Sequence, residues 1–252
     1  MKYAIILGDG MADYPVPSLG GKTPLEVADT PCMDELAKTG RIGLVKTVPD
    51  GYKPGSDVAN LGALGYDARD CYTGRSPLEA LSIGVDMKED DVALRTNLVT
   101  LSGEGEFCDL VMEDYSAGEI STAEARELIE YVQRELGSEK FTFYAGVSYR
   151  HLLIIAHGDA DMRLTPPHDI SGRRIGDHLP EGAQSEELLA LMERAYALLK
   201  NHPVNLKRTE EGKEPANCIW FWGQGTRPTL ENFEARYGLK GGMVSAVDLL
   251  KG

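Results

Sequence analysis

Tyr3-Ala4-Ile5-Ile6-Leu7-Gly8-Asp9-Gly10 is the stretch of sequence that decides the fold class. Its apolar run is continuous instead of alternating, which is typical of a strand buried on both faces of a parallel sheet. The run stops at two glycines around Asp9, so the chain is expected to turn at the carboxyl edge of the sheet, where ligands of α/β proteins bind. Asp9 is therefore a candidate metal ligand; the alternative is a turn aspartate that binds only its own backbone.

The order of strand, loop and helix recurs further along the chain. Thr30 as N-cap, Pro31 and a closing Gly40 predict a helix, and residues 42–48 predict the next strand. Another helix is expected after Pro54-Gly55. This repetition predicts an α/β fold with a doubly wound parallel sheet. The pattern breaks off inside an expected helix at residue 252, so this core is expected to be incomplete.

From about residue 92 the pattern changes to that of an α+β unit. Its expected strands and helices are 92–101, 107–113, a helix from Ser121 with Glu124 in a capping box, 141–145, 151–157 and a helix after Ser185. A buried strand at 217–222 is expected to return to the core. The chain is thus divided into 1–91 (core, first part), 92–212 (inserted α+β domain) and 213–252 (core resumes).

Charge and composition narrow the class of protein. Lys and Arg number 26 against 40 Asp and Glu, a net charge of −14, which would repel nucleic acid and anionic membranes. No apolar run approaches the ~20 residues of a membrane span, and no signal peptide is evident. Four cysteines without a Cys-x-x-Cys pair are typical of reduced thiols. We expect a cytoplasmic protein that acts on a small molecule, as a monomer or a homo-oligomer.

Ser56 is the candidate nucleophile. It follows Pro54-Gly55 at the start of an expected helix, where the hydroxyl and the first backbone N–H groups favour an anion. The alternative is that Ser56 is only an N-cap residue. Because no nearby histidine supplies a base, activation by a metal fits better than a Ser-His-Asp triad.

Arginine side chains suit phosphate and carboxylate oxygens. Those that could do so here are Arg95, Arg150, Arg173, Arg174 and Arg227. His168, between Pro166-Pro167 and Asp169, could bind a phosphate or a metal. Each of these side chains could equally be an ordinary surface or structural group. No nucleotide-binding glycine motif is present.

Several ordered motifs resemble one family, the archaeal-type cofactor-independent phosphoglycerate mutases of the alkaline phosphatase superfamily. They are Gly8-Asp9-Gly10-Met11-Ala12-Asp13, Gly21-Lys22-Thr23-Pro24-Leu25-Glu26, Pro54-Gly55-Ser56-Asp57-Val58-Ala59-Asn60-Leu61 and Tyr72-Thr73-Gly74-Arg75-Ser76-Pro77-Leu78-Glu79-Ala80-Leu81. The similarity continues through 91–97, Pro166-Pro167-His168, 215–217 and 237–240, and so spans the chain.

The resemblance implies an activity: 3-phosphoglycerate and 2-phosphoglycerate are interconverted in glycolysis through a phosphoserine at Ser56, without a 2,3-bisphosphoglycerate requirement. Asp9 and Ser56 would belong to a two-metal centre, usually Mn²⁺ or else Mg²⁺, and the inserted domain would close over the phosphoglycerate. The residues implied to contact substrate or to lie beside the nucleophile are Arg95, Arg150, His168, Arg75 and Asn60.

The remaining metal ligands of the family have no counterpart in these residues, so the chain alone is expected to be inactive. The alternatives are a related phosphotransferase, such as a homoserine-kinase-like enzyme or a phosphatase of the same superfamily, and a non-catalytic fragment that binds a phosphorylated ligand or a partner.

Overall fold

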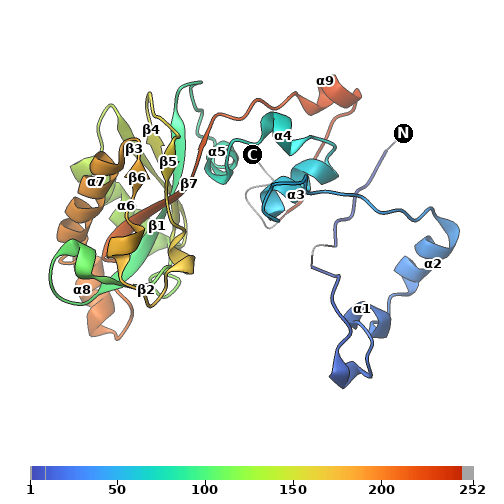
Figure 1. The fold of residues 1–252 in the computed structure, drawn as a ribbon, viewed down its shortest axis with the longest axis horizontal. Coiled ribbons are helices and arrows are strands. Elements are labelled where there is room, and N and C mark those ends of the chain that lie inside the picture. The colour runs from blue at the N-terminus through green and yellow to red at the C-terminus, as the bar shows by residue number, and fades with distance from the viewer. Residues whose placement is uncertain (1, 9, 246–252) are drawn as a thin grey trace. The chain divides into compact units, whose positions relative to one another are not determined.

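The structure, a computed structural model, describes residues 2–8 and 10–245 (Figure 1). Its contacts divide the chain into two units, Met1–Lys46 and Thr47–Gly252. The first unit contains η1 (Pro17–Leu19), α1 (Pro24–Val27) and α2 (Pro31–Thr39). The boundaries of α2 confirm the prediction, with Thr30 as N-cap and Gly40 as C-cap.

The two strands predicted around the first unit are not found. Residues 2–8 and 42–48, as described, form no strand, and their apolar side chains are exposed, Ile6 by 93% and Leu44 by 105%. A parallel strand of this composition is stable only when neighbours cover both of its faces. The described residues therefore do not confirm the doubly wound core.

The second unit contains most of the regular structure. Its elements are α3 (Ser56–Ala63), α4 (Ala68–Cys71), α5 (Arg75–Ser82), β1 (Val92–Ser102), η2 (Phe107–Asp109), β2 (Val111–Asp114), α6 (Thr122–Leu136), β3 (Phe141–Val147), β4 (Arg150–Ile155), β5 (Met162–Arg163), η3 (Pro167–Asp169), η4 (Ile175–His178), β6 (Glu181–Gly182), α7 (Ser185–Leu199), α8 (Pro203–Glu210), β7 (Cys218–Thr226) and α9 (Phe233–Tyr237).

An antiparallel sheet centred on β1 organises this unit. β4 and β7 pair with the same stretch of β1, from opposite edges, and β2 pairs with its last residues. β3 lies outside β4. The prediction that 217–222 returns to a parallel core is therefore wrong: this segment belongs to β7, antiparallel to β1. A buried apolar run does not reveal which strand it pairs with, because pairing is decided by distant residues.

The two faces of the sheet are covered differently (Figure 1). α6 and α7, the two amphipathic helices predicted after Ser121 and Ser185, pack on one face and bury their apolar sides, for example Leu128 and Leu191. On the other face α5 packs against β1 and β7, where Ala80 contacts a smaller cluster with Ala93 and Leu152. Among the described helices, none combines the length and hydrophobicity that a membrane span requires. On the face that α5 covers, the apolar cluster is small, and polar side chains occupy part of the remaining surface.

Candidate functional site

Three consecutive polar residues, Arg95, Thr96 and Asn97, interrupt the apolar sequence of β1. Arg95 and Asn97 are both buried, 5% and 1% exposed. Side chains alternate along a strand, so Arg95 and Asn97 share one face and Thr96 lies on the other. Arg95 is paired across the sheet with Trp222 of β7, and Asn97 with Arg150 of β4. Register thus gathers two arginines, an amide and an indole on the face that α5 covers in part.

Arg95 is held from both sides. Its guanidinium lies over the Trp222 ring, 4.8 Å from the centroid, and its Nη1 donates to Glu79 Oε1 at 2.7 Å. Glu79 also accepts from Nε of Arg75 at 2.8 Å, four residues earlier on α5. Burial lowers the pKa of Arg95, Glu79 opposes this, and the charges of Arg75 and Arg150 lower it further. The three arginines therefore lie close enough to form one positive region.

His168 joins this region through Trp222. Its ring lies 5.2 Å from that of Trp222 and 6.0 Å from that of Tyr115, both in edge-on geometry. Trp222 Nε1 in turn donates to Asn97 Oδ1 at 2.9 Å, which fixes the indole under Arg95. His168 is exposed, so its imidazole is available to a ligand.

The charges of these arginines also affect the pKa of His151. Burial lowers the pKa of this imidazole to about 3, and the charges of Arg95 and Arg150 contribute. Nδ1 accepts from the Gly146 backbone at 3.0 Å, so the proton of the neutral ring lies on Nε2. Nearby positive charges disfavour a second proton. An anion on the open face would meet the same field.

Ser56 occupies the first position of α3. The Ala59 backbone N–H donates to the Gly55 carbonyl at 3.0 Å, so Gly55 is the N-cap and the alternative role of Ser56 as N-cap is wrong. The Ser56 side chain is exposed. Asn60, one turn later, donates to the Ser56 carbonyl at 2.7 Å. Gly55 has no side chain to cap the helix, so α3 presents a serine hydroxyl beside first-turn N–H groups of which Val58 N–H already donates to Asp57.

Tyr72 connects this serine turn to α5. Its hydroxyl donates to the carboxylate of Asp57, whose other oxygen accepts from the Val58 backbone at 3.0 Å. Burial raises the pKa of Tyr72, Asp57 adds to the increase, and Arg75 opposes it. Tyr72 therefore lies between the residue after Ser56 and the first arginine of the positive region.

A metal centre is not formed by these residues alone. In the described part of the chain no three His, Cys, Asp or Glu side chains are grouped so as to hold a metal ion. Asp9 lies outside the described residues, and Asp57 is engaged by Tyr72. The described residues thus do not by themselves complete the two-metal centre that the resemblance implies.

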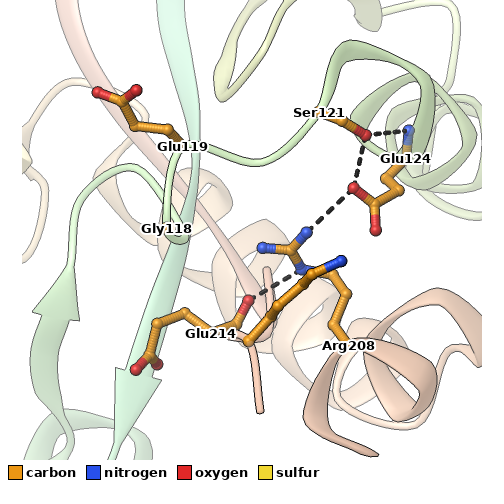
Figure 2. Close-up of a pocket in the computed structure, with 7 residues that line it drawn as sticks. Gly118, Glu119, Ser121, Glu124, Arg208 and Glu214 are labelled. Carbon is orange, nitrogen blue, oxygen red and sulfur yellow. Dashed lines mark hydrogen bonds and ion pairs between the residues drawn. The ribbon is translucent and has the colours of Figure 1, made fainter. Parts of the chain in front are cut away.

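A pocket of about 330 Å³ lies elsewhere, around α8 and the start of α6 (Figure 2). Its buried guanidinium, Arg208, is anchored in the fold through each of its three nitrogens: it donates to the Glu214 carbonyl at 2.9 Å, to Glu124 at 3.1 Å and to the Ala117 carbonyl at 2.7 Å. The pocket is therefore a structural junction, and the face around Trp222 is the stronger candidate site.

Sequence reasoning found the cations of this face but missed the residues that orient them. Glu79 and Asn97 were not singled out. Trp222 falls in the predicted buried strand 217–222 but is only half-buried, whereas Trp220 and Phe221 are fully buried. The signal available was the run of polar residues 95–97 inside an apolar strand. In the described part of the chain, two of the other candidate arginines form ion pairs away from this face, Arg174 with Asp109 and Arg227 with Asp86, and Arg173 forms no ion pair with a residue of this face.

Comparison with known proteins identifies the family. The family model of 2,3-bisphosphoglycerate-independent phosphoglycerate mutase matches residues 37–205, more than half of the chain. The chain belongs to this family. A probable 2,3-bisphosphoglycerate-independent phosphoglycerate mutase of Geobacter sulfurreducens is 56% identical over 252 residues, and a mutase of the same name from Methanosarcina barkeri is 53% identical over 253 residues.

The alignments with these mutases cover the whole of this chain. They cover only 63% and 62% of the two relatives, so the chain spans less than two thirds of their length. Solved structures agree with this placement. A Pyrococcus horikoshii protein superimposes with a TM-score of 0.72 at 30% identity, over 96% of this chain and 56% of its own. A cofactor-independent phosphoglycerate mutase from Thermoplasma acidophilum gives 0.53 at 27%, over 96% and 64%.

Proposed function

We propose that the protein containing this chain is a 2,3-bisphosphoglycerate-independent phosphoglycerate mutase, which interconverts 3-phosphoglycerate and 2-phosphoglycerate through a phosphoserine at Ser56. The observation that carries the proposal is the alignment of the whole chain, at 56% identity, with a relative of that name. The geometry supports it, because an exposed serine at a helix N-terminus is linked through Tyr72 to a face rich in arginine.

Each part of the site has a role in this proposal. Ser56 Oγ bonds to phosphorus while the bond from phosphorus to the substrate oxygen breaks, and the serine proton passes to that leaving oxygen. N–H groups at the start of α3 stabilise the charge of the phosphoryl group. Arg75, Arg95 and Arg150 hold the phosphate and carboxylate oxygens of the phosphoglycerate, as bidentate guanidinium groups do. His168 contacts the same anion from η3. The glycerate stays bound and reorients before it takes the phosphoryl group back on its other hydroxyl.

Further parts of the proposal rest on the resemblance. Divalent ions, manganese or magnesium, would bind through Asp9 and Ser56 with ligands outside the described residues. The division into 1–91, 92–212 and 213–252, with its second boundary moved so that β7 stays in the inserted domain, would let that domain close over the substrate, with Asn60 supporting the Ser56 turn. We also propose a cytoplasmic location and, from the net charge of −14, no nucleic-acid or membrane partner; a homo-oligomer is compatible with this function.

The test uses the full reading frame that contains this chain. Incubated with 3-phosphoglycerate, the protein should form 2-phosphoglycerate, followed by ³¹P NMR, and Ser56→Ala should lower turnover at least about 10³-fold. The matched control is Ser185→Ala, because Ser185 also opens a helix, α7, without capping it. Near wild-type turnover by Ser56→Ala would remove this serine from the mechanism.

The same assay separates the alternatives. Release of inorganic phosphate without 2-phosphoglycerate would indicate a phosphatase, and ATP-dependent phosphorylation of homoserine would indicate a kinase-like enzyme. Binding of phosphoglycerate with no turnover in the full reading frame would favour a non-catalytic protein. The comparisons give no reason to prefer any of these over the mutase.

A further inference from the structure

One carboxylate oxygen joins two arginines on the face around Trp222. Glu79 Oε1 accepts from Arg75 Nε at 2.8 Å and from Arg95 Nη1 at 2.7 Å. Because both bonds end on the same atom, the two nitrogens lie no more than about 5.5 Å apart, the sum of these distances. Guanidinium groups this close can contact the same tetrahedral oxyanion.

Glu79 also leaves donors free on both arginines. A guanidinium carries five N–H donors, and Glu79 uses one of them on each side chain. Nε of Arg95 is buried and has no partner among the described atoms. Arg75, with 35% of its side chain exposed, opens toward solvent. The pair is thus fixed at one edge and available at the other.

Arg95 needs this support more than a surface arginine does. Its side chain is 6% exposed, and Glu79 is the one carboxylate within ion-pair distance of it in the described part of the chain. A buried charge without a partner is strongly unfavourable and its side chain would move toward water. Movement of Arg95 would break its stacking on Trp222, which lies 4.8 Å away.

The negative charge of Glu79 also has an unfavourable effect on anion binding, because it weakens the positive potential that attracts an anion. Removing that charge would therefore lower the affinity for an anion if alignment of the arginines dominates, and would raise it if the potential dominates. We infer that Glu79 is a positioning residue: it aligns Arg75 and Arg95 as one oxyanion site, and the affinity gained by alignment exceeds the affinity lost to its charge. The inference rests on the proposed function of this face as the phosphate-binding site.

Binding of inorganic phosphate to the purified chain, measured by calorimetric titration, tests the sign. Glu79→Gln keeps the size of the side chain and one acceptor oxygen but removes the charge, and it should weaken binding about tenfold. Glu79→Asp keeps the charge but shortens the side chain, and it should also weaken binding. The control is Glu135→Gln, which removes the carboxylate of a remote surface pair with Arg134 and should bind as wild type.

The opposite pattern would overturn the inference. If charge alone mattered, Glu79→Gln would bind phosphate more tightly and Glu79→Asp would bind as wild type. Absence of phosphate binding by the wild-type chain would also overturn it, since there would be no site to align. Thermal unfolding of each variant checks the fold, and Glu79→Asp, which retains an ion-pair partner for Arg95, serves if Glu79→Gln does not fold.

A kinetic measurement on the full reading frame keeps this inference separate from the mutase proposal. Arginines that bind substrate and transition state alike should, when misaligned, raise KM about tenfold and leave kcat within about twofold. A purely structural defect would instead lower the amount of active enzyme, and so kcat, without changing KM. If the protein has no mutase activity but phosphate binding responds to Glu79 as expected, the mutase proposal fails and the inference stands.

Discussion

Alanine at Gly74 should break the contact that seats α5 on the sheet. Gly74 is the N-cap of α5 and has φ +149° and ψ 170°, a conformation that side chains rarely adopt. A Cβ placed there would lie 2.1 Å from the carbonyl oxygen of Gln224 and 2.9 Å from Cα of Gly225, both in β7. The backbones of α5 and β7 therefore touch at a point where only hydrogen atoms fit.

The other end of α5 offers a matched control. Gly84 also has a positive φ, +77°, but a Cβ added there would meet nothing within 4 Å. Gly84→Ala should therefore cost about 1 kcal/mol of backbone strain. Gly74→Ala should cost about 1–3 kcal/mol of backbone strain. It also creates an overlap that is relieved only if the two backbones separate by about 1.3 Å, from 2.1 Å to the 3.4 Å of ordinary contact. Overpacking of this kind costs about 1–3 kcal/mol, so we expect a total near 4 kcal/mol.

Urea unfolding followed by tryptophan fluorescence measures this difference. Both tryptophans of the chain, Trp220 and Trp222, lie on β7 and report on the contacted sheet. A difference of about 3 kcal/mol between the two variants corresponds to a midpoint shift of about 1 M urea or more. Gly74→Ala should also bind phosphate more weakly, because α5 carries Glu79. Equal midpoints for Gly74→Ala and Gly84→Ala would refute the close approach of α5 and β7.

Three further predictions concern buried polar groups. Arg208→Met should lower the free energy of unfolding by about 3 kcal/mol, because Glu124 and two carbonyls lose their donor. The control Lys207→Met, on the same helix, should lower it by less than about 0.5 kcal/mol. Equal urea midpoints for the two variants would contradict this prediction. The pKa of His151 in the native state is about 3, whereas that of a free imidazole is ~6.5. As the pH falls below ~6.5, only the unfolded state therefore takes up this proton. The free energy of unfolding should fall by up to about 1.4 kcal/mol per pH unit, and His151→Gln should flatten that slope. Burial raises the pKa of Cys218, so a thiol reagent should modify exposed Cys32 in the native protein and Cys218 only in urea; native-state labelling of Cys218 would count against its burial.

Local patterns in the sequence predict the helices of the second unit well. The apolar period places Leu128 of α6 and Leu191 of α7 in the core, and both are fully or nearly fully buried. Ser121 caps α6 as predicted, since it accepts from the Glu124 backbone at 3.3 Å. The predicted capping box is nevertheless incomplete, because the Glu124 carboxylate accepts from the Ser121 hydroxyl and not from its backbone N–H. These features depend on residues within a few positions of each other, so a single sequence is sufficient to predict them.

Sheet partners and site geometry are not available from such patterns. The pairing of β7 with β1 joins residues that are far apart in the sequence, Asn97 with Trp220 for example. The resemblance named Arg95 and Arg150, but only the register of β1 with β4 shows that they share a face. Glu79 looks like an ordinary surface residue of a helix until Arg95 is placed beside it. The strand predicted at 3–7 fails for the same reason, since its apolar side chains have no partner in the described chain.

Residues 72–79 couple the serine turn to the arginine face. At one end Tyr72 binds Asp57, the residue after Ser56, and at the other end Glu79 binds Arg95 of β1. Between them, the Gly74 backbone rests directly on β7. A displacement of α5 must therefore change the position of the proposed nucleophile and of the proposed anion site together. If the face binds phosphate, occupancy of Arg75 and Arg95 would restrain this segment and, through Tyr72, the turn that presents Ser56.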